Sequence, residues 1–165
     1  MFGIQSSLVM YDEEYQRIVT IAEKLLRDSN AKAVFLVDRN GQLMAATGET
    51  EHLDTTSLAS LTAGNIAATG GLAKLIGEKE FSILFHEGEK DNIHISIVAG
   101  RIILVVIFDQ RSSLGLVRLR VKKGSEEFAR IFEDMDNRLT AEGAGMSPHN
   151  PFAEITDDDI DNLFR

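Results

Sequence analysis

The spacing of apolar residues changes several times along the chain, and each spacing predicts a different element. Between Asp12 and Asp28 the apolar residues recur every three or four positions, which is typical of an amphipathic helix. Acidic residues open this stretch, where the helix dipole favours negative charge. The residues predicted to be buried are Tyr15, Ile18, Val19, Ala22, Leu25 and Leu26.

Two short apolar runs come next and predict a β-hairpin. Ala31–Asp38 and Leu43–Thr47 flank the pair Asn40-Gly41. Asn-Gly favours a two-residue hairpin turn, because both central positions of that turn need a positive φ. We therefore predict two antiparallel strands joined by a two-residue turn.

The stretch from Asp54 to Gly77 predicts a long helix with two different stripes. Asp54, Thr55 and Thr56 are candidate N-caps, and Gly77 is a plausible C-terminal stop. At about 100° per residue, one stripe is predicted to face the core: Leu58, Leu61, Asn65, Ala68, Leu72, Leu75 and Ile76. The second, which we call the small-residue stripe, has little side-chain bulk: Ser60, Gly64, Ala67, Gly71 and Lys74.

The interior glycines of this helix, Gly64, Gly70 and Gly71, need a physical reason. A glycine inside a helix costs about 0.5–1 kcal/mol relative to alanine. The usual reason is the close approach of another backbone. The residues alone leave two alternatives equally open: the glycines pack against this chain's own sheet or helices, or they face another molecule.

Three more strands follow this helix. Phe81–Glu87 is predicted to be a short strand. Asn92–Val98 alternates, with isoleucines at 93, 95 and 97, which is typical of a half-buried antiparallel strand. Ile102–Phe108 is apolar throughout, so it should be central and covered on both faces.

A last helix is predicted to begin at Ser112 or Ser113 and to end at about Leu139. Its predicted buried residues are Leu116, Leu119, Phe128, Ile131, Phe132 and Met135. The element order favours an α+β fold, an α/β sandwich with a five-stranded antiparallel sheet and helices on its faces. Ile102–Phe108 should lie in the middle of the sheet and Phe81–Glu87 at one edge, where a second copy could pair.

The composition changes at Thr140, so we predict a folded domain over 1–139 and a flexible linker with an acidic tail over 140–165. Thr156 can cap a short helix whose first turn is acidic. Ile160, Leu163 and Phe164 share one face of that helix. Such a short helix is marginal alone, so we expect it to fold in the groove of a partner. The alternative is an acidic tail that only aids solubility.

Composition and motifs favour a regulator over an enzyme. The chain has 165 residues, a net charge of −9 and no cysteine, which disfavours nucleic acid or an anionic membrane as the main partner and excludes thiolate metal sites. Neither a transmembrane run nor a signal peptide is evident, so a cytoplasmic protein is expected. The run His86–Lys90 lacks the second histidine of a zinc protease, and Gly64–Lys74 does not match a phosphate-binding loop. No cofactor or metal is predicted, and the histidines should be exposed or hydrogen-bonded: His52, His86, His94 and His149.

Basic residues are few but gather on the last helix. They are Arg118, Arg120, Lys122, Lys123 and Arg130, with Arg17 on the first helix. Two interpretations stay open: a solvated helix face, or an acceptor for an acidic segment of a partner or of the chain's own tail.

Several strings resemble the Roadblock/dynein light chain family, and within it the bacterial polarity proteins that act with Ras-like small GTPases of the MglA type. They are VFLVDRNGQL, DTTSLASLTAGNIAATGGLAKLIGE, FHEGEKDN, VVIFDQRSSLGLVRLRVKK and PFAEITDDDIDNLF. The resemblance implies a homodimer whose edge strands pair and whose central helices form a platform for one GTPase. It also implies a GTPase-activating protein that repositions the GTPase's own catalytic residues without an arginine finger, with a role in polarity and motility at a cell pole.

The resemblance also implies which residues meet the partner. The GTPase-binding positions are Ser60, Gly64, Ala67, Gly71 and Lys74, and the tail contacts are Ile160, Leu163 and Phe164. The tail would bind the GTPase away from the platform and assist nucleotide exchange. Arg17, Lys123 and Arg130 match positions that are basic in the family and form a possible basic partner surface. The alternative is a dimeric scaffold without effect on GTP turnover, of the dynein light chain type.

Overall fold

The computed structural model describes residues 10–145, with side chains through 143. The chain divides into two compact units, residues 1–133 and 134–165. The described elements are α1 (Asp12–Ser29), β1 (Ala33–Asp38), β2 (Leu43–Gly48), α2 (Thr55–Leu75), β3 (Ile83–Glu87), β4 (Asn92–Val98), β5 (Ile102–Phe108) and α3 (Leu114–Gly145). This order is the one that the hydrophobic pattern predicts.

The five strands form one antiparallel sheet in the order β2-β1-β5-β4-β3. The apolar strand β5 is central and all seven of its residues are buried, as predicted. β3 is an edge strand, also as predicted. The fold is therefore an α+β sandwich of the expected kind.

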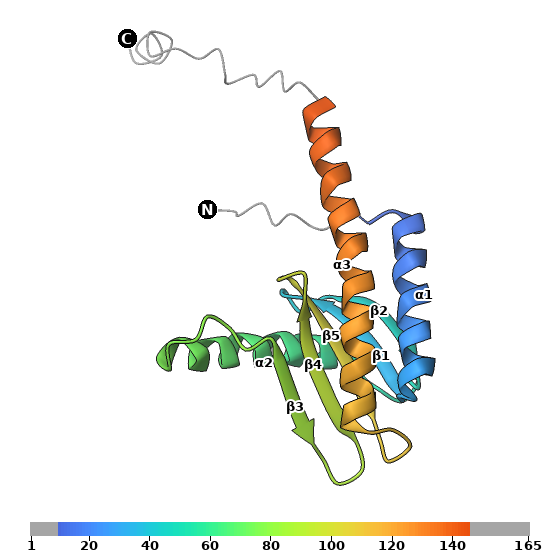
Figure 1. Cartoon of the computed structure of the whole chain (residues 1–165), viewed down its shortest axis with the longest axis vertical. Coiled ribbons are helices and arrows are strands. Elements are labelled where there is room, and N and C mark those ends of the chain that lie inside the picture. The colour runs from blue at the N-terminus through green and yellow to red at the C-terminus, as the bar shows by residue number, and fades with distance from the viewer. Residues whose placement is uncertain (1–9, 146–165) are drawn as a thin grey trace. The chain divides into compact units, whose positions relative to one another are not determined.

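Side chains alternate between two covered faces of the sheet. On one face the core residues of the sheet pack with Ala59 and Ile66 of α2. They are Ala33, Phe35, Val37, Ile95, Ile103, Val105 and Ile107. Figure 1 shows α2 crossing behind the strands while α1 and α3 lie on the opposite face. Because both faces are covered, β4 is not the half-exposed strand that its alternation predicts.

The β1–β2 turn differs from the prediction. Three residues, 39–41, separate Asp38 from Gln42, whose carbonyl oxygen accepts the Asp38 N–H at 3.0 Å. Gly41 has a φ of +85°, whereas Asn40 is not among the described residues with positive φ. The type I′ turn that Asn-Gly favours needs a positive φ at both central positions. The predicted two-residue turn is therefore wrong, and the carboxylate of Asp38, which accepts the N–H of Asn40 and of Gln42 at 2.9 Å, favours the three-residue turn.

Both ends of α2 form as the sequence predicts. Asp54 caps the N-terminus by accepting the Ser57 N–H at 3.0 Å and the Ser57 hydroxyl at 2.6 Å. At the other end Gly77 has a φ of +83°. The N–H of Glu78 donates to the Ala73 carbonyl oxygen at 2.8 Å, and the N–H of Gly77 donates to the Lys74 carbonyl oxygen at 3.3 Å. These two bonds make a Schellman motif, which stops the helix.

The predicted core-facing stripe of α2 is wrong. The buried residues of the helix are Ala59, Thr62, Ile66 and Ala73. Of the predicted stripe, Leu58 and Asn65 are half-buried and the others are exposed: Leu61, Ala68, Leu72, Leu75 and Ile76. The helix packs on the sheet through Ala59 and Ile66, with Leu58 and Ala63 partly buried beside them, and exposes Leu61, Leu72 and Leu75.

The outer helices bury most, but not all, of the residues predicted. In α1, Ile18, Ala22 and Leu25 are buried and Tyr15 is exposed. In α3 the four predicted residues from Phe128 to Met135 are buried. Leu116 is half-buried, Leu119 is exposed, and Val117 and Val121 are buried in their place.

Helix α3 also continues to Gly145, six residues past the predicted end. Arg138 and Glu142 form an i,i+4 ion pair at 3.3 Å in this segment. The hydroxyl of Thr140 donates to the Asp136 carbonyl at 2.9 Å. Alanine, glutamate and threonine can continue a helix, so the change in composition at Thr140 does not end it.

His94 does not fit the prediction that the histidines are exposed or hydrogen-bonded. Its side chain is 1% exposed. Among the residues described, neither ring nitrogen has a hydrogen-bond partner, and the hydroxyl of Ser96 has none either. Burial, and then the nearby Arg118 guanidinium, lower the pKa of His94 from its ordinary value of 6.5. His86, by contrast, is exposed, and its Nε2 forms a hydrogen bond with Asn65 Nδ2 at 2.9 Å. His149 lies outside the described residues.

The different surroundings of Gly48 and Gly64 predict opposite effects of alanine substitution on stability. Gly48 has a φ of +95°, and a Cβ there would overlap the Lys32 carbonyl oxygen and approach Ala33 Cα to 3.0 Å. Gly48→Ala should therefore lower the free energy of unfolding by about 1–3 kcal/mol, measured by urea denaturation. In the matched variant Gly64→Ala, a Cβ would meet nothing within 4 Å, so we expect a gain of about 0.5–1 kcal/mol. A loss of stability in Gly64→Ala would show that another backbone packs on α2 in the assembled protein.

The burial of His94 predicts how the free energy of unfolding depends on pH. Its pKa is lowered in the folded state, so below about pH 6.5 the unfolded chain binds a proton that the folded chain resists. The free energy of unfolding should fall as the pH drops below that value, and His94→Leu should make this fall shallower. Urea denaturation at matched concentrations between about pH 7.5 and 5.5 measures it. His86→Gln is the control and should keep the wild-type slope, whereas a wild-type slope in His94→Leu would contradict the assignment.

Candidate partner-binding surface

The small-residue stripe of α2 lies on the surface. Ser60, Gly64, Ala67, Gly71 and Lys74 are all exposed. A Cβ added to Gly64 or Gly71 would meet nothing within 4 Å. Of the two alternatives for the glycines, packing against the described part of this chain is therefore wrong. The stripe presents an open strip of backbone.

Beside this stripe runs a second exposed strip, which we call the leucine strip: Leu61, Leu72 and Leu75. Their side chains are 74%, 58% and 83% exposed. Figure 1 shows that the C-terminal end of α2 projects beyond the edge strand β3. Leu72 and Leu75 belong to this projecting end. Three largely exposed leucines on one helix are an uncovered apolar surface, which in a soluble protein marks an interaction site.

The neighbouring edge strand β3 is also uncovered. Ile83 and Phe85 are exposed, and β3 pairs with β4 alone in the described sheet. His86 of this strand bonds to Asn65 of α2 at 2.9 Å, which joins the strand to the helix. The edge therefore offers backbone hydrogen-bonding groups next to the leucine strip.

Arg39 holds together the loops at one end of this surface. Its Nε and Nη2 donate to the Gly100 carbonyl at 3.1 and 2.8 Å. Nη2 also pairs with Glu80 Oε1 at 2.7 Å. Arg39 thus connects the β1–β2 hairpin, the β4–β5 turn and the segment that follows α2. These contacts limit the freedom of the chain between α2 and β3.

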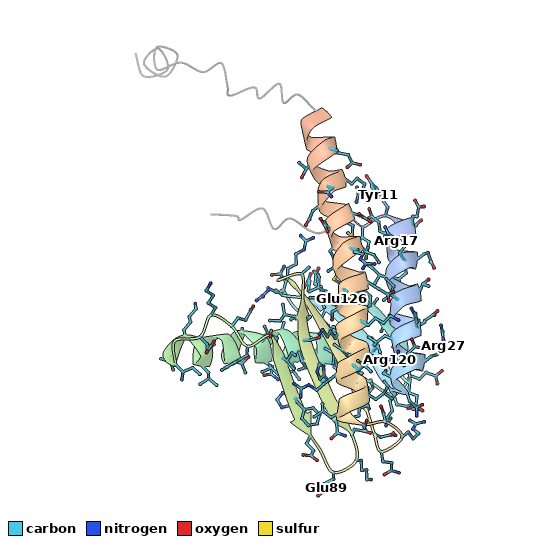
Figure 2. The ribbon with its side chains drawn as sticks, viewed as in Figure 1. Tyr11, Arg17, Arg27, Glu89, Arg120 and Glu126 are labelled. Carbon is cyan, nitrogen blue, oxygen red and sulfur yellow. The ribbon has the colours of Figure 1, made fainter. Side chains whose placement is uncertain are left out.

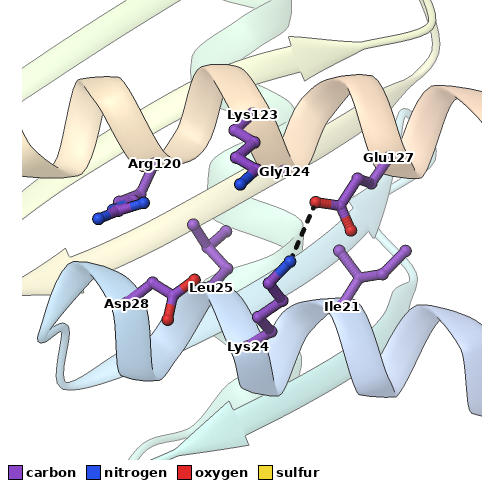
Figure 3. Close-up of a pocket in the computed structure, with 8 residues that line it drawn as sticks. All are labelled: Ile21, Lys24, Leu25, Asp28, Arg120, Lys123, Gly124 and Glu127. Carbon is purple, nitrogen blue, oxygen red and sulfur yellow. Dashed lines mark hydrogen bonds and ion pairs between the residues drawn. The ribbon is translucent and has the colours of Figure 1, made fainter.

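The basic residues gather along the groove between α1 and α3, on the other face of the sheet. Arg17 and Arg130 line one part of the groove, and Arg120 and Lys123 line the next. Figure 2 labels Arg17 on α1 and Arg120 on α3. The two helices meet closely where Gly124 faces Leu25 (Figure 3).

This groove contains acidic residues as well, including Asp28 and Glu127. Lys24 pairs with Glu127 at 3.5 Å, and Figure 3 shows this ion pair across the two helices. The structure therefore brings Arg17, Lys123 and Arg130 to one mixed-charge face. A partner role for these three residues remains a prediction.

Sequence reasoning missed the leucine strip as a surface because it assigned the bulkiest stripe to the core. A signal was available in the alternative stripe Ala59, Thr62, Ile66 and Ala73, which also repeats at helical spacing. The predicted tail contacts Ile160, Leu163 and Phe164 lie outside the described residues. Within residues 10–145, no group of three or more histidines, cysteines or carboxylates could hold a metal ion. The described helices include none with the length and apolar character needed to cross a membrane.

Known proteins resemble this chain over most of its length. Residues 18–108 match the Roadblock/LC7 domain. Myxococcus xanthus MglB is 61% identical, with a TM-score of 0.74 over 77% of this chain and 96% of that chain. The gliding protein MglB from Thermus thermophilus is 37% identical, with a TM-score of 0.73 over 79% of this chain and 99% of that chain.

A third structure, described as MglB with a tetrameric arrangement, is 37% identical, with a TM-score of 0.74 over 80% of this chain and 99% of that one. A search of curated protein sequences finds no significant match. The family match covers more than half of the chain, and the similarity to the Myxococcus protein extends over nearly all of that relative. The chain therefore belongs to the Roadblock/LC7 family, among its MglB proteins.

Proposed function

We propose that this protein is a GTPase-activating protein for a Ras-like small GTPase of the MglA type and that it acts as a homodimer. The observation that carries the proposal is the exposed small-residue stripe of α2, in a chain that is 61% identical to an MglB. The protein would regulate its partner and would have no active site of its own.

The homodimer is proposed to form through the leucine strip and the edge of β3. Full burial of a leucine side chain contributes about 1.5–3 kcal/mol, so covering three largely exposed leucines on each protomer would supply several kcal/mol. Antiparallel pairing of two β3 edges would add backbone hydrogen bonds. Both features lie on the side of the molecule where α2 projects past the sheet (Figure 1).

The GTPase is proposed to sit on the small-residue stripes of the paired α2 helices. Because Gly64, Ala67 and Gly71 present almost no side chain, the backbone of the GTPase could approach the helix closely. Lys74 is the single cation between residues 60 and 76, so the stripe offers no arginine to the nucleotide site. Acceleration would then come from repositioning the catalytic groups of the GTPase itself, which positioning and electrostatics allow in phosphoryl transfer.

The tail is proposed to make a separate contact. In this proposal residues 1–139 form the dimerising and GTPase-binding domain, and 140–165 comprise the linker and tail. Ile160, Leu163 and Phe164 would bind the GTPase away from the platform and promote nucleotide exchange. The Thermus relative is described as a gliding protein. We extend a role in motility and polarity to this protein, which would act in the cytoplasm and at a cell pole.

Arginine substitutions on the stripe test the platform. Ala67→Arg or Gly71→Arg should abolish the stimulation of GTP hydrolysis, lowering the stimulated rate at least about tenfold, because the added side chain blocks close approach. Single-turnover hydrolysis by the GTPase, with and without saturating protein, measures this effect. Light scattering should show that both variants remain dimers. Glu126→Arg, at an exposed position of α3 labelled in Figure 2, is the matched control and should stimulate normally.

Three outcomes would count against parts of the proposal. Wild-type protein that binds the GTPase without accelerating hydrolysis would indicate a scaffold instead of an activator. Monomeric Ala67→Arg or Gly71→Arg would place the stripe in the dimer interface. A dimeric Leu72→Asp variant would show that the leucine strip does not hold the dimer.

Removal of the tail tests the second contact. Deleting residues 146–165 leaves the described part of α3 whole. We expect hydrolysis stimulation to remain largely intact and nucleotide exchange to slow, because only the separate tail contact is lost. Release of a fluorescent nucleotide from the GTPase measures the exchange rate. The full-length variant with alanine at 160, 163 and 164 should behave like the deletion. Exchange at the wild-type rate in both variants would refute a role for the tail.

A further inference from the structure

The C-terminal half of α2 is attached to the rest of the fold by few contacts. In this helix, which the structure describes throughout, Ala73 is the only buried residue after Ile66. Gly70 and Gly71 add backbone freedom to the same half, because glycine loses more conformational entropy on folding than any other residue. A helix held in this way needs support from neighbouring segments to keep one orientation on the sheet.

The β1–β2 turn, residues 39–41, contacts α2 directly at Gly41. A Cβ added to Gly41 would lie 3.1 Å from Ser60 Cα and 3.6 Å from Ala63 Cβ. A side chain at this position would therefore press on the backbone of the helix, and the φ of +85° also favours glycine. The turn thus lies against the flank of α2 that carries Ser60, the first residue of the small-residue stripe.

The same turn reaches the segment that follows α2 through Arg39. Asp38, the last residue of β1, pairs with Ile102, the first residue of β5. This register brings the turn beside Gly100, whose carbonyl oxygen accepts Arg39 Nε and Nη2 at 3.1 and 2.8 Å. Nη2 also pairs with Glu80 Oε1 at 2.7 Å, and Glu80 lies between α2 and β3. Two of the three guanidinium nitrogens are therefore engaged within the chain.

We propose that the β1–β2 turn is a brace that holds α2 in the orientation that presents the small-residue stripe, and that Arg39 is its positioning residue. Gly41 supports one flank of the helix, and Arg39 fixes the segment at its C-terminal end. Support at two separate points prevents the helix from pivoting about either one. Misplacement by about 1 Å can slow an assembled catalytic site about 10²-fold, so the orientation of the helix matters for a GTPase seated on it. The inference rests on the proposed function, but the brace can also be measured without the partner.

The role assigned to Arg39 differs from that of an arginine finger. A positioning residue sets the fraction of the protein that is ready to bind. Its loss raises the protein concentration needed for half-maximal stimulation and leaves the saturated rate unchanged. A finger stabilises the transition state, so its loss lowers the saturated rate itself. The half-maximal concentration and the saturated rate therefore separate the two roles.

Amide hydrogen exchange in the full chain without the GTPase, followed by NMR, tests the brace. Two amides report on the segment that Arg39 holds. The N–H of Glu78 donates to the Ala73 carbonyl oxygen at 2.8 Å, and the N–H of Ile97 donates to the Ser82 carbonyl oxygen at 3.0 Å. Arg39→Ala should make both amides exchange at least about threefold faster, because the segment between α2 and β3 opens more often.

Two controls show whether this change is local. The amide of Leu25, a buried residue of α1, should exchange at the wild-type rate in Arg39→Ala. Lys24→Ala breaks an exposed ion pair with Glu127 on the other face of the sheet. This matched variant should leave the exchange of residues 78 and 97 unchanged.

Single-turnover hydrolysis by the GTPase, measured over a range of protein concentrations, tests the effect on the partner. Arg39→Ala should raise the concentration for half-maximal stimulation about two- to fivefold and keep the saturated rate. Arg39→Lys keeps the charge without the fork of donors, and Glu80→Gln keeps the bonds from Arg39 to Gly100. Each should give a smaller rise than Arg39→Ala. Lys24→Ala should give none.

Faster exchange confined to residues 78 and 97, together with a higher half-maximal concentration, supports the inference. Unchanged exchange in Arg39→Ala would overturn it, and so would equal acceleration at Leu25, which indicates global destabilisation. A lower saturated rate at an unchanged half-maximal concentration would overturn it by showing that Arg39 acts on the nucleotide. If the wild-type protein stimulates no hydrolysis, the proposed activation fails, and the exchange rates alone decide whether the brace exists.

Discussion

Helix α2 packs on the sheet through Ala59 and Ile66, and this contact determines which of its other residues are exposed. The same contact turns Leu61, Leu72 and Leu75 away from the core, because they lie on the other side of the helix. Those leucines can then be covered only by something outside the described fold.

The two strips of α2 have different physical requirements. Exposure of the leucine strip to water is unfavourable, and covering it would lower the free energy. A permanent partner, such as a second copy, suits this strip. The small-residue stripe has little to gain from burial, but it permits another backbone to come close. A permanent homodimer would suit the leucine strip. A GTPase that binds and dissociates would suit the small-residue stripe.

The face of the sheet that α1 and α3 cover carries charges of both signs. The basic residues lie along α1 and α3 with acidic residues among them, and paired ions such as Lys24 and Glu127 reduce the local field.

Much of the fold could be predicted from local patterns. The bounds of β4 and β5, the cap at Asp54 and the stop at Gly77 depend on residues near one another in the chain. The predictions that failed depend on contacts that the local pattern does not show. Asn40 does not enter the expected turn because the Asp38 carboxylate accepts two backbone N–H groups of the loop. His94 is buried without a hydrogen bond because α3 covers a face of β4 that the alternation suggested was open.

For the candidate site, the amino-acid pattern alone is enough to show that α2 has stripes of different bulk and that three of its interior positions are glycine. Helical periodicity gives these facts without reference to any neighbour. Which stripe faces the sheet depends on the tertiary fold, in which Ala59 and Ile66 pack on the strands and Leu61, Leu72 and Leu75 are exposed. The physical reason is that periodicity shows which residues share a side of a helix, whereas the sheet decides which side fits. Ala59 and Ile66 fit against the sheet, so the leucines that the periodicity assigned to the core are surface residues.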